Sequence, residues 1–184
     1  MTRTKPNVRK GMGLIVVILV LAFLLAVGMT VISVTQTGPE VAGSVRLQQQ
    51  TLETAEAGFD VAWRQLSDQF SGGLISDFST LYRTTYNGSP GLDDPLDTAN
   101  YFRRLSDKQL VDDVKARPDN ELFADVDMPG KDPDISSDNW FGYTVFLIND
   151  EALGTQDVTD CILVSIGRGP RNSYARIEVE IALQ

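Results

Sequence analysis

The side chains that could do chemistry in this chain are carboxylates, because it has no histidine and a single cysteine. Asp125 and Asp127 stand two residues apart, and Gly130 takes the sixth position of a calcium-loop spacing. Pro129 replaces the third ligand and Ser136 replaces the bidentate glutamate, so the pattern favours a solvated turn. Calcium at Asp125 and Asp127 is the one metal considered, and no other cofactor is expected.

Adjacent aspartates occur at Asp93–Asp94 and Asp112–Asp113. Two carboxyl groups about 5–10 Å apart in a cleft can hydrolyse a glycosidic bond, so a membrane-anchored hydrolase is one hypothesis. Exposed surface charge is the favoured interpretation of both pairs. Without histidine there is no Ser-His triad and no usual zinc ligand. We therefore expect no catalytic activity. Cys161, at the start of an apolar stretch, is expected to be a small core residue.

The charge is unevenly distributed along the chain. The formal net charge is −9, from 16 basic and 25 acidic residues, and four of the basic residues lie within the first ten. The remaining chain is strongly acidic and has no basic cluster. Because binding to nucleic acid phosphates needs clustered Lys and Arg, no nucleic acid partner is expected.

A long uncharged segment follows the basic start of the chain. No charged residue occurs from Gly11 to Pro39, and a helix over Met12–Val34 would span roughly 30 Å, the thickness of a bilayer's hydrocarbon core. A cleaved secretory signal has a shorter apolar region of about 7–15 residues. A single-pass anchor is the simplest alternative. The basic start would remain in the cytoplasm and the rest of the chain would cross the membrane.

The helical pattern continues beyond the apolar segment. Apolar residues recur at spacings of three and four, which predicts an amphipathic helix with one buried seam: Val41, Val45, Leu52, Ala55, Phe59, Ala62 and Leu66. Gly38 and Pro39 predict a kink or a melted turn around Thr35–Pro39. Gly72 and Gly73 predict the end of the helix.

These features together resemble a known family. The basic leader ending in Lys10–Gly11, the opening "MGLIVVILVL" and the run "RLQQQTLETAEAGFDVAW" are similar to the type IV pilin superfamily, most of all to the PilX-type minor pilins. The family-like run is Ala55, Glu56, Ala57 and Gly58. The resemblance covers roughly residues 9–66. Glu56 fits equally well as a solvent-facing glutamate and as a subunit contact.

The resemblance implies a processing step and a set of partners. A prepilin peptidase would cut after Gly11, and the new amino terminus at Met12 would be methylated. The apolar helix, residues 12–37, would hold the subunit in the bacterial inner membrane, with the body in the periplasm, and later pack in the filament core. The expected partners are major and minor pilins, the peptidase and the pilus assembly platform. The core-packing residues would be Leu14, Val16, Leu19, Phe23 and Gly28.

One position departs from the major-pilin pattern. Val16 is the fifth residue counted from Met12, where major pilins usually have a glutamate. A buried carboxylate there can pair with the terminal ammonium of a neighbouring subunit, which valine cannot do. A position in a priming complex or at the filament tip therefore fits this chain better than the role of the bulk subunit. The GspK-type tip pseudopilin of type II secretion is the second choice in the superfamily, although such proteins are usually larger.

The remaining chain predicts an α+β head. The domains expected are a leader (1–11), the apolar helix (12–37), its amphipathic continuation (38–71) and a periplasmic head (72–184). "TANYFRRLSDKQLVDDVKA" fits one helix, and three alternating stretches between about 140 and 183 predict an antiparallel sheet laid on the long helix. Trp63 and Trp140 are expected in the core. A single-pass membrane protein with a periplasmic binding domain is the hypothesis outside the pilins.

Overall fold

The structure is a computed structural model that describes residues 12–118, 121–129, 140–149, 151 and 157–182. The side chains of residues 12, 34–40 and 121 are outside this description. The chain divides into two compact units, Met1–Val45 and Arg46–Gln184, which we call the N-terminal and C-terminal units and describe separately. The calcium-loop positions Gly130 and Ser136 lie outside the described residues.

Helix α1 spans Met12–Ser71. It stays helical across Gly38 and Pro39, so the melted turn expected there is wrong. The physical reason is that an internal proline removes one backbone hydrogen bond, which the surrounding turns of a long helix can tolerate. A bend at this position stays a prediction.

The C-terminal end of α1 forms a helix cap of the Schellman type. Gly73 has a φ of +66°, its N–H donates to the Phe70 carbonyl at 3.0 Å, and the Leu74 N–H donates to the Gln69 carbonyl at 2.9 Å. Because a left-handed residue at this position is nearly always glycine, the predicted stop at Gly72 and Gly73 is confirmed.

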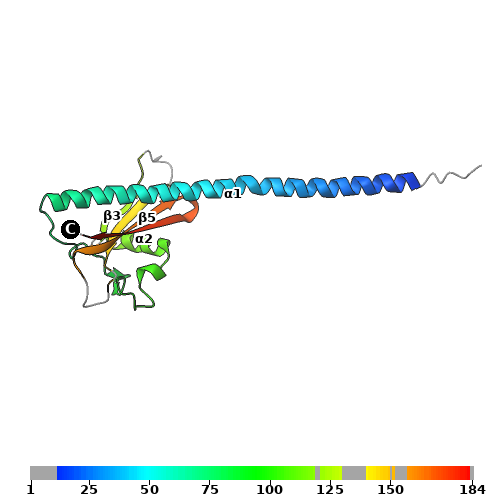
Figure 1. The fold of residues 1–184 in the computed structure, drawn as a ribbon. Coiled ribbons are helices and arrows are strands. Elements are labelled where there is room, and N and C mark those ends of the chain that lie inside the picture. The colour runs from blue at the N-terminus through cyan, green and yellow to red at the C-terminus, as the bar shows by residue number, and fades with distance from the viewer. Residues whose placement is uncertain (1–11, 119–120, 130–139, 150, 152–156, 183–184) are drawn as a thin grey trace, which may run out of the picture. The chain divides into compact units, whose positions relative to one another are not determined.

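The C-terminal unit contains a four-stranded antiparallel sheet in the order β3-β4-β5-β6 (Figure 1). The strands are β3 (Glu121–Asp127), β4 (Gly142–Ile148), β5 (Asp160–Gly169) and β6 (Ser173–Ala182). The last three confirm the predicted sheet. The first was missed, because Asp125 and Asp127 at its end were expected in a solvated turn. β3 carries two register irregularities against β4, which break its alternation.

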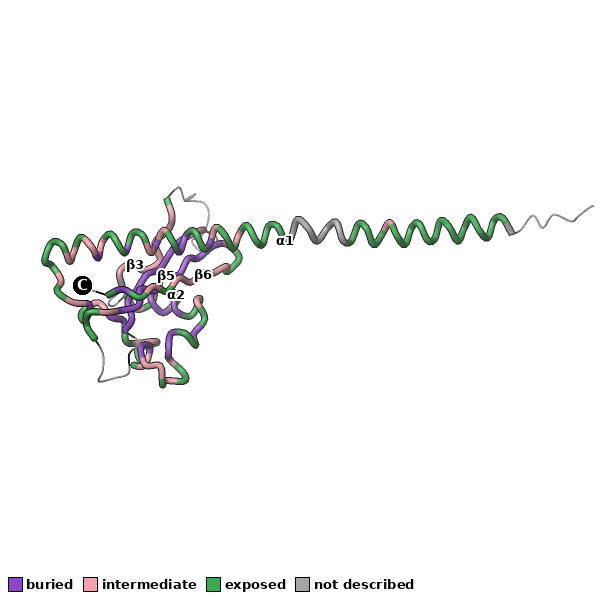
Figure 2. Tube along the Cα trace, in the orientation of Figure 1, coloured by how far each residue is buried: buried purple, intermediate pink, exposed green. Residues whose placement is uncertain are grey.

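One face of the sheet packs against α1 from Arg46 onward. The buried cluster on this face combines the end of α1, the segment after it and alternate residues of β4, β5 and β6: Ala62, Leu66, Phe78, Tyr82, Tyr143, Val145, Leu147, Cys161, Leu163 and Ile181. The predicted packing of the sheet on the long helix is confirmed. The seam is shorter than predicted, because Val41, Val45 and Leu52 are exposed, as is Trp63 at 44 %. Figure 2 shows the alternation of buried and exposed residues along this helix.

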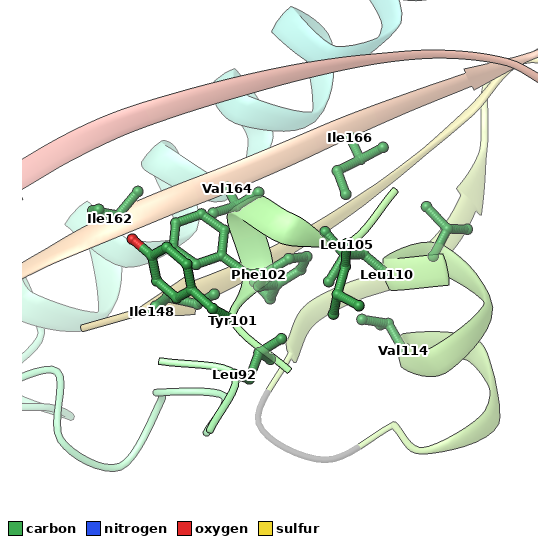
Figure 3. Close-up of a cluster of buried hydrophobic side chains, with 12 residues drawn as sticks. Leu92, Tyr101, Phe102, Leu105, Leu110, Val114, Ile148, Ile162, Val164 and Ile166 are labelled. Carbon is green, nitrogen blue, oxygen red and sulfur yellow. The ribbon is translucent and has the colours of Figure 1, made fainter. Parts of the chain in front are cut away.

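The opposite face is covered by helix α2 (Asp107–Ala116) and the segment before it, which includes the 3₁₀ turn η1 (Phe102–Arg104). This second cluster (Figure 3) contains Leu92, Tyr101, Phe102, Leu105, Leu110, Val111, Val114, Phe146, Ile148, Ile162, Val164 and Ile166. Ser106 begins α2 with a capping box to Gln109, which satisfies two terminal backbone donors. Both faces of β4 and β5 are therefore buried.

Short elements complete the C-terminal unit. β1 (Thr85–Tyr86) and β2 (Ser89–Pro90) form a hairpin, and η3 (Pro170–Asn172) joins β5 to β6. Asn87 and Gly88, at the hairpin turn, both have positive φ, of 51° and 76°. This pair of left-handed residues is typical of a type I′ turn.

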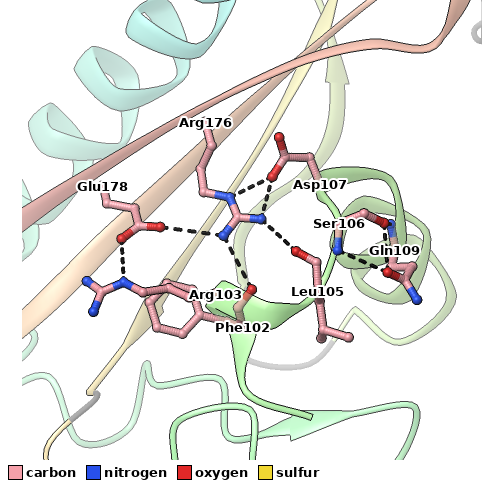
Figure 4. A network of polar contacts seen from close by, with 8 residues as sticks. All are labelled: Phe102, Arg103, Leu105, Ser106, Asp107, Gln109, Arg176 and Glu178. Carbon is pink, nitrogen blue, oxygen red and sulfur yellow. Dashed lines mark hydrogen bonds and ion pairs between the residues drawn. The ribbon is translucent and has the colours of Figure 1, made fainter. Parts of the chain in front are cut away.

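A network of hydrogen bonds and ion pairs joins β6 to the segment before α2, which covers the sheet face opposite α1 (Figure 4). Arg176 forms an ion pair with Asp107 and donates to the Leu105 carbonyl at 3.0 Å. Glu178 accepts from Arg103 at 2.8 Å. The polar residues of β6 thus follow the predicted alternation, opposite to the face that packs on α1.

Cys161 is a core residue, as expected, at 3 % exposure on β5. Burial raises the pKa of its thiol to about 12, and the nearby Asp160 adds to the shift. We expect the folded chain at pH 8 to react with iodoacetamide at least about a hundredfold more slowly than the chain in concentrated guanidinium chloride, because the thiolate is the reactive form. Mass spectrometry of the alkylated protein over time measures this. Equal rates in the two conditions would contradict the burial.

Candidate functional site

The N-terminal unit presents one long apolar helical surface. The segment Gly13–Ser33 is 21 residues long, contains no buried residue and is apolar enough to cross a membrane. At about 1.5 Å per residue, its length matches the hydrocarbon core of a bilayer. It is the only such helix among the residues that the structure describes. An apolar surface of this size needs lipid or protein around it.

The predicted core-packing residues all lie on this surface. Leu14, Val16, Leu19 and Phe23 are 67, 55, 64 and 69 % exposed. Gly28 is half-buried, and a Cβ added there would meet nothing within 4 Å. The structure thus makes these side chains available to a neighbour, and their filament contacts stay a prediction. Gly11 lies outside the described residues, and Met12 is the first residue of α1.

The family-like run has a role in the C-terminal unit. Ala55 is fully buried and its carbonyl accepts a hydrogen bond from the Ser165 hydroxyl of β5 at 2.7 Å. A Cβ at Gly58 would lie 2.8 Å from both the Ser165 Oγ and the Tyr143 Cγ. Small residues at these positions therefore let α1 approach the sheet closely. Glu56 is exposed, and Ala57 is half-buried.

Residues that the sequence pattern did not single out complete this contact. A Cβ at Gly167 of β5 would lie 2.7 Å from the Ala55 nitrogen and against the Thr51 carbonyl oxygen. Thr51 is fully buried, and its hydroxyl shares a hydrogen bond of 3.0 Å with the Ser173 hydroxyl. Tyr143 of β4, which lies against Gly58, is also buried, and this burial raises the pKa of its hydroxyl. A search for small and hydroxyl residues at helical spacing, rather than for apolar ones, would have found Thr51.

The aspartates considered for calcium contact cations of the protein. Asp125 in β3 lies 2.9 Å from the Arg168 Nε and 3.0 Å from the Lys115 Nζ. Asp127 lies 3.2 Å from an Arg168 nitrogen. Arg168 is 3 % exposed, so the two carboxylates neutralise a buried charge. Among the described residues, no group of three potential ligands could hold a metal.

The adjacent aspartate pairs are separated by their surroundings. Asp113 is buried and lies 2.7 Å from an Arg83 nitrogen, whereas Asp112 is half-exposed and pairs with Lys108. Asp93 is 7 % exposed, and Asp94 accepts from the Leu96 N–H in a turn. The interpretation as surface charge is therefore wrong for Asp113 and Asp93, which are both buried, because neighbours in sequence can have different surroundings. The absence of catalytic activity stays a prediction.

Comparison of the chain with protein-family models, with curated proteins and with solved structures gives no match.

Proposed function

We propose that this protein is a minor subunit of a type IV pilus-type filament, with a structural role in priming or capping assembly. The observation that supports it most is the exposed apolar helix of Gly13–Ser33, which belongs to the same helix α1 that later docks on an antiparallel sheet. A purely lipid-embedded anchor does not need its helix to extend into the folded body. A subunit that moves from the membrane into a fibre does need this, because its apolar half must be positioned against other subunits.

Charge gives the direction of insertion in this proposal. Arg3, Lys5, Arg9 and Lys10 precede the apolar segment, and no acid occurs before Glu40. Basic residues next to a membrane helix stay on the cytoplasmic side, so the acidic body would enter the periplasm. The subunit would stay in the inner membrane until it is extracted into the filament.

Val16 supports a minor rather than a bulk subunit. If the chain is cut after Gly11, a charged amino group is created at Met12, at the end of an apolar helix. Burying that ammonium group without a counter-charge would be costly in a filament core. Val16 provides no such charge. At the tip or in a priming complex, the amino group need not pair with a neighbouring copy.

The proposed partners follow from the same helix. Other minor and major pilins would pack on residues 12–37 by shape and apolar burial, a prepilin peptidase would cut the leader, and the assembly platform would extract the subunit. A minor pseudopilin of type II secretion uses the same helix and the same processing. Co-purification with sheared pili or with secretion components separates the two.

The test is the mature amino terminus. In cells that possess a prepilin peptidase, we expect mass spectrometry to find a chain that begins at methylated Met12, without residues 1–11. Replacing Gly11 with leucine is expected to leave the leader attached, because the peptidase would have to accept a bulky side chain at the cut. Gly13→Leu is the matched control and should be processed normally, because position 13 does not precede the bond that is cut; a side chain there would meet nothing within 4 Å in the chain itself.

Retention of the leader in the wild-type chain would overturn the proposal. It would leave a single-pass anchor with a periplasmic domain, which keeps its basic start because no step removes it. Processing of the Gly11→Leu variant at the same bond would show that the protease does not require glycine before the cut and is not the peptidase that the resemblance implies.

A further inference from the structure

The outer edge of β6 is regular and unoccupied by any described strand. β6 pairs with β5 through ten consecutive residue pairs, from Asp160 with Ala182 to Gly169 with Ser173, without an irregularity. It is the last strand of the sheet, so among the described residues only β5 pairs with Ala175–Ala182. Backbone groups of an antiparallel strand alternate in direction, so about half of the N–H and C=O groups of this segment point outward.

The other edge of the sheet is built differently. β3 is shorter, carries two register irregularities, and contains Asp125 in a left-handed conformation with a φ of 46°. Bulges and charges of this kind prevent a second strand from pairing with an edge. The sheet therefore has one protected edge and one edge that can accept a strand.

A cavity lies beside the end of β6 on the face that packs against α1. Its volume is about 210 Å³, and its apolar lining comes from α1, the following segment and β6, through Trp63, Phe70, Phe78 and Ile181. Trp63 is 44 % exposed and was expected in the core. A strand added beside β6 would direct alternate side chains toward this face, where an aliphatic side chain can enter the cavity.

The charge on the opposite face indicates the chemistry of the partner. Glu180 of β6 is exposed, whereas Glu178 already pairs with Arg103 and Arg176, and the chain after its first ten residues carries an excess of acidic over basic side chains. A strand with Lys or Arg at alternate positions would place a cation opposite the Glu180 carboxylate. The same acidic excess opposes a second copy of this chain, because like charges opposite each other destabilise the pairing.

We propose that the outer edge of β6, Ala175–Ala182, accepts an extended strand of another protein, in which apolar residues alternate with Lys or Arg. Main-chain hydrogen bonds would provide the affinity, while the cavity and Glu180 would select the sequence. This inference goes beyond the proposed function and does not depend on processing at Met12. Failure of one would leave the other intact.

The probe is a blocked eight-residue peptide with four Lys-Val repeats, added to the full chain in detergent. We expect hydrogen exchange to slow at least tenfold at alternate amides of Ala175–Ala182. A peptide of the same composition with four lysines followed by four valines should give no such protection. A second control is the repeat peptide with N-methyl groups on alternate backbone nitrogens, placed on the peptide edge that would face β6. It should give no protection, because those nitrogens cannot donate hydrogen bonds.

Charge variants provide the second measurement. Glu180→Lys is expected to weaken binding of the repeat peptide about fivefold by fluorescence anisotropy, whereas Glu56→Lys, the same change on an exposed face of α1, should leave it unchanged. Absence of protection in β6 overturns the proposal, as does equal protection by the block or N-methylated peptide. Equal weakening by both variants, or protection of β6 through self-association without peptide, overturns it as well.

Discussion

Replacing Asp113 with alanine is expected to lower the free energy of unfolding of the C-terminal unit by about 3–5 kcal/mol, the range for breaking a buried ion pair from one side. Asp113 and Arg83 are 5 and 3 % exposed, and their charged atoms lie 2.7 Å apart. Asp113 also accepts from the Asn87 N–H at 2.8 Å and from Arg117. The substitution therefore removes a counter-charge from a buried guanidinium and breaks the hydrogen bond from α2 to the β1–β2 hairpin.

Asp112→Ala is the matched control, because it removes the neighbouring carboxylate from the same helix. Asp112 pairs with Lys108 on the surface, where both side chains are more than half exposed. Such a pair is worth less than about 1 kcal/mol. Chemical denaturation of the full chain in detergent, followed by circular dichroism, measures both variants. If the two variants lose stability by the same amount, the buried pair does not hold the hairpin and α2 to the sheet.

The contrast between Asp112 and Asp113 shows why the sequence alone failed at this site. Two adjacent aspartates on a helix point about 100° apart, so one can face the core and the other solvent. Which one is buried depends on Arg83, 30 residues away in the sequence. No local pattern contains that information.

The elements of the sheet were predictable to different degrees. β6 alternates cleanly, and its apolar face packs against α1 through Ile181 as predicted. β3 was missed because Asp125 and Asp127 interrupt its alternation of apolar and polar residues. Both carboxylates form ion pairs with Arg168, and neither ends the strand. A buried arginine on β5 thus explains acidic residues that look like turn signals.

Apolar spacing predicted only part of the helix seam: Ala55, Ala62 and Leu66 are buried as expected. Apolar spacing selected Val41, Val45 and Leu52, which are exposed. The residues of α1 that lie closest to β5 have small side chains, because the backbones approach closely there. Thr51 and Gly58 are among them, and a hydropathy scale does not mark either as apolar. The apolar helix of the candidate site was predictable, because a long uncharged apolar segment can be recognised from composition alone. The cut after Gly11 is made by another protein, so the structure of this chain does not test it.

Replacing Gly167 with alanine is expected to destabilise the C-terminal unit by about 3 kcal/mol, at the upper end of the range for overpacking a core. The added Cβ would lie against the Thr51 carbonyl oxygen and 2.7 Å from the Ala55 nitrogen, both backbone atoms of α1. Backbone cannot rotate away as a side chain can, so the helix must move off the sheet. That movement would break the hydrogen bond from Ser165 to the Ala55 carbonyl.

Gly43→Ala tests whether the effect comes from this contact or from glycine replacement in general. Gly43 lies in the same helix, and an added Cβ would meet nothing within 4 Å. Alanine there should leave the C-terminal unit unchanged and favour the helix by up to about 1 kcal/mol. Denaturation midpoints of the two variants, with hydrogen exchange of β5, give the comparison. Unchanged stability of Gly167→Ala would mean that α1 does not rest on β5 at this distance, and the role assigned to Ala55 and Gly58 would fail with it.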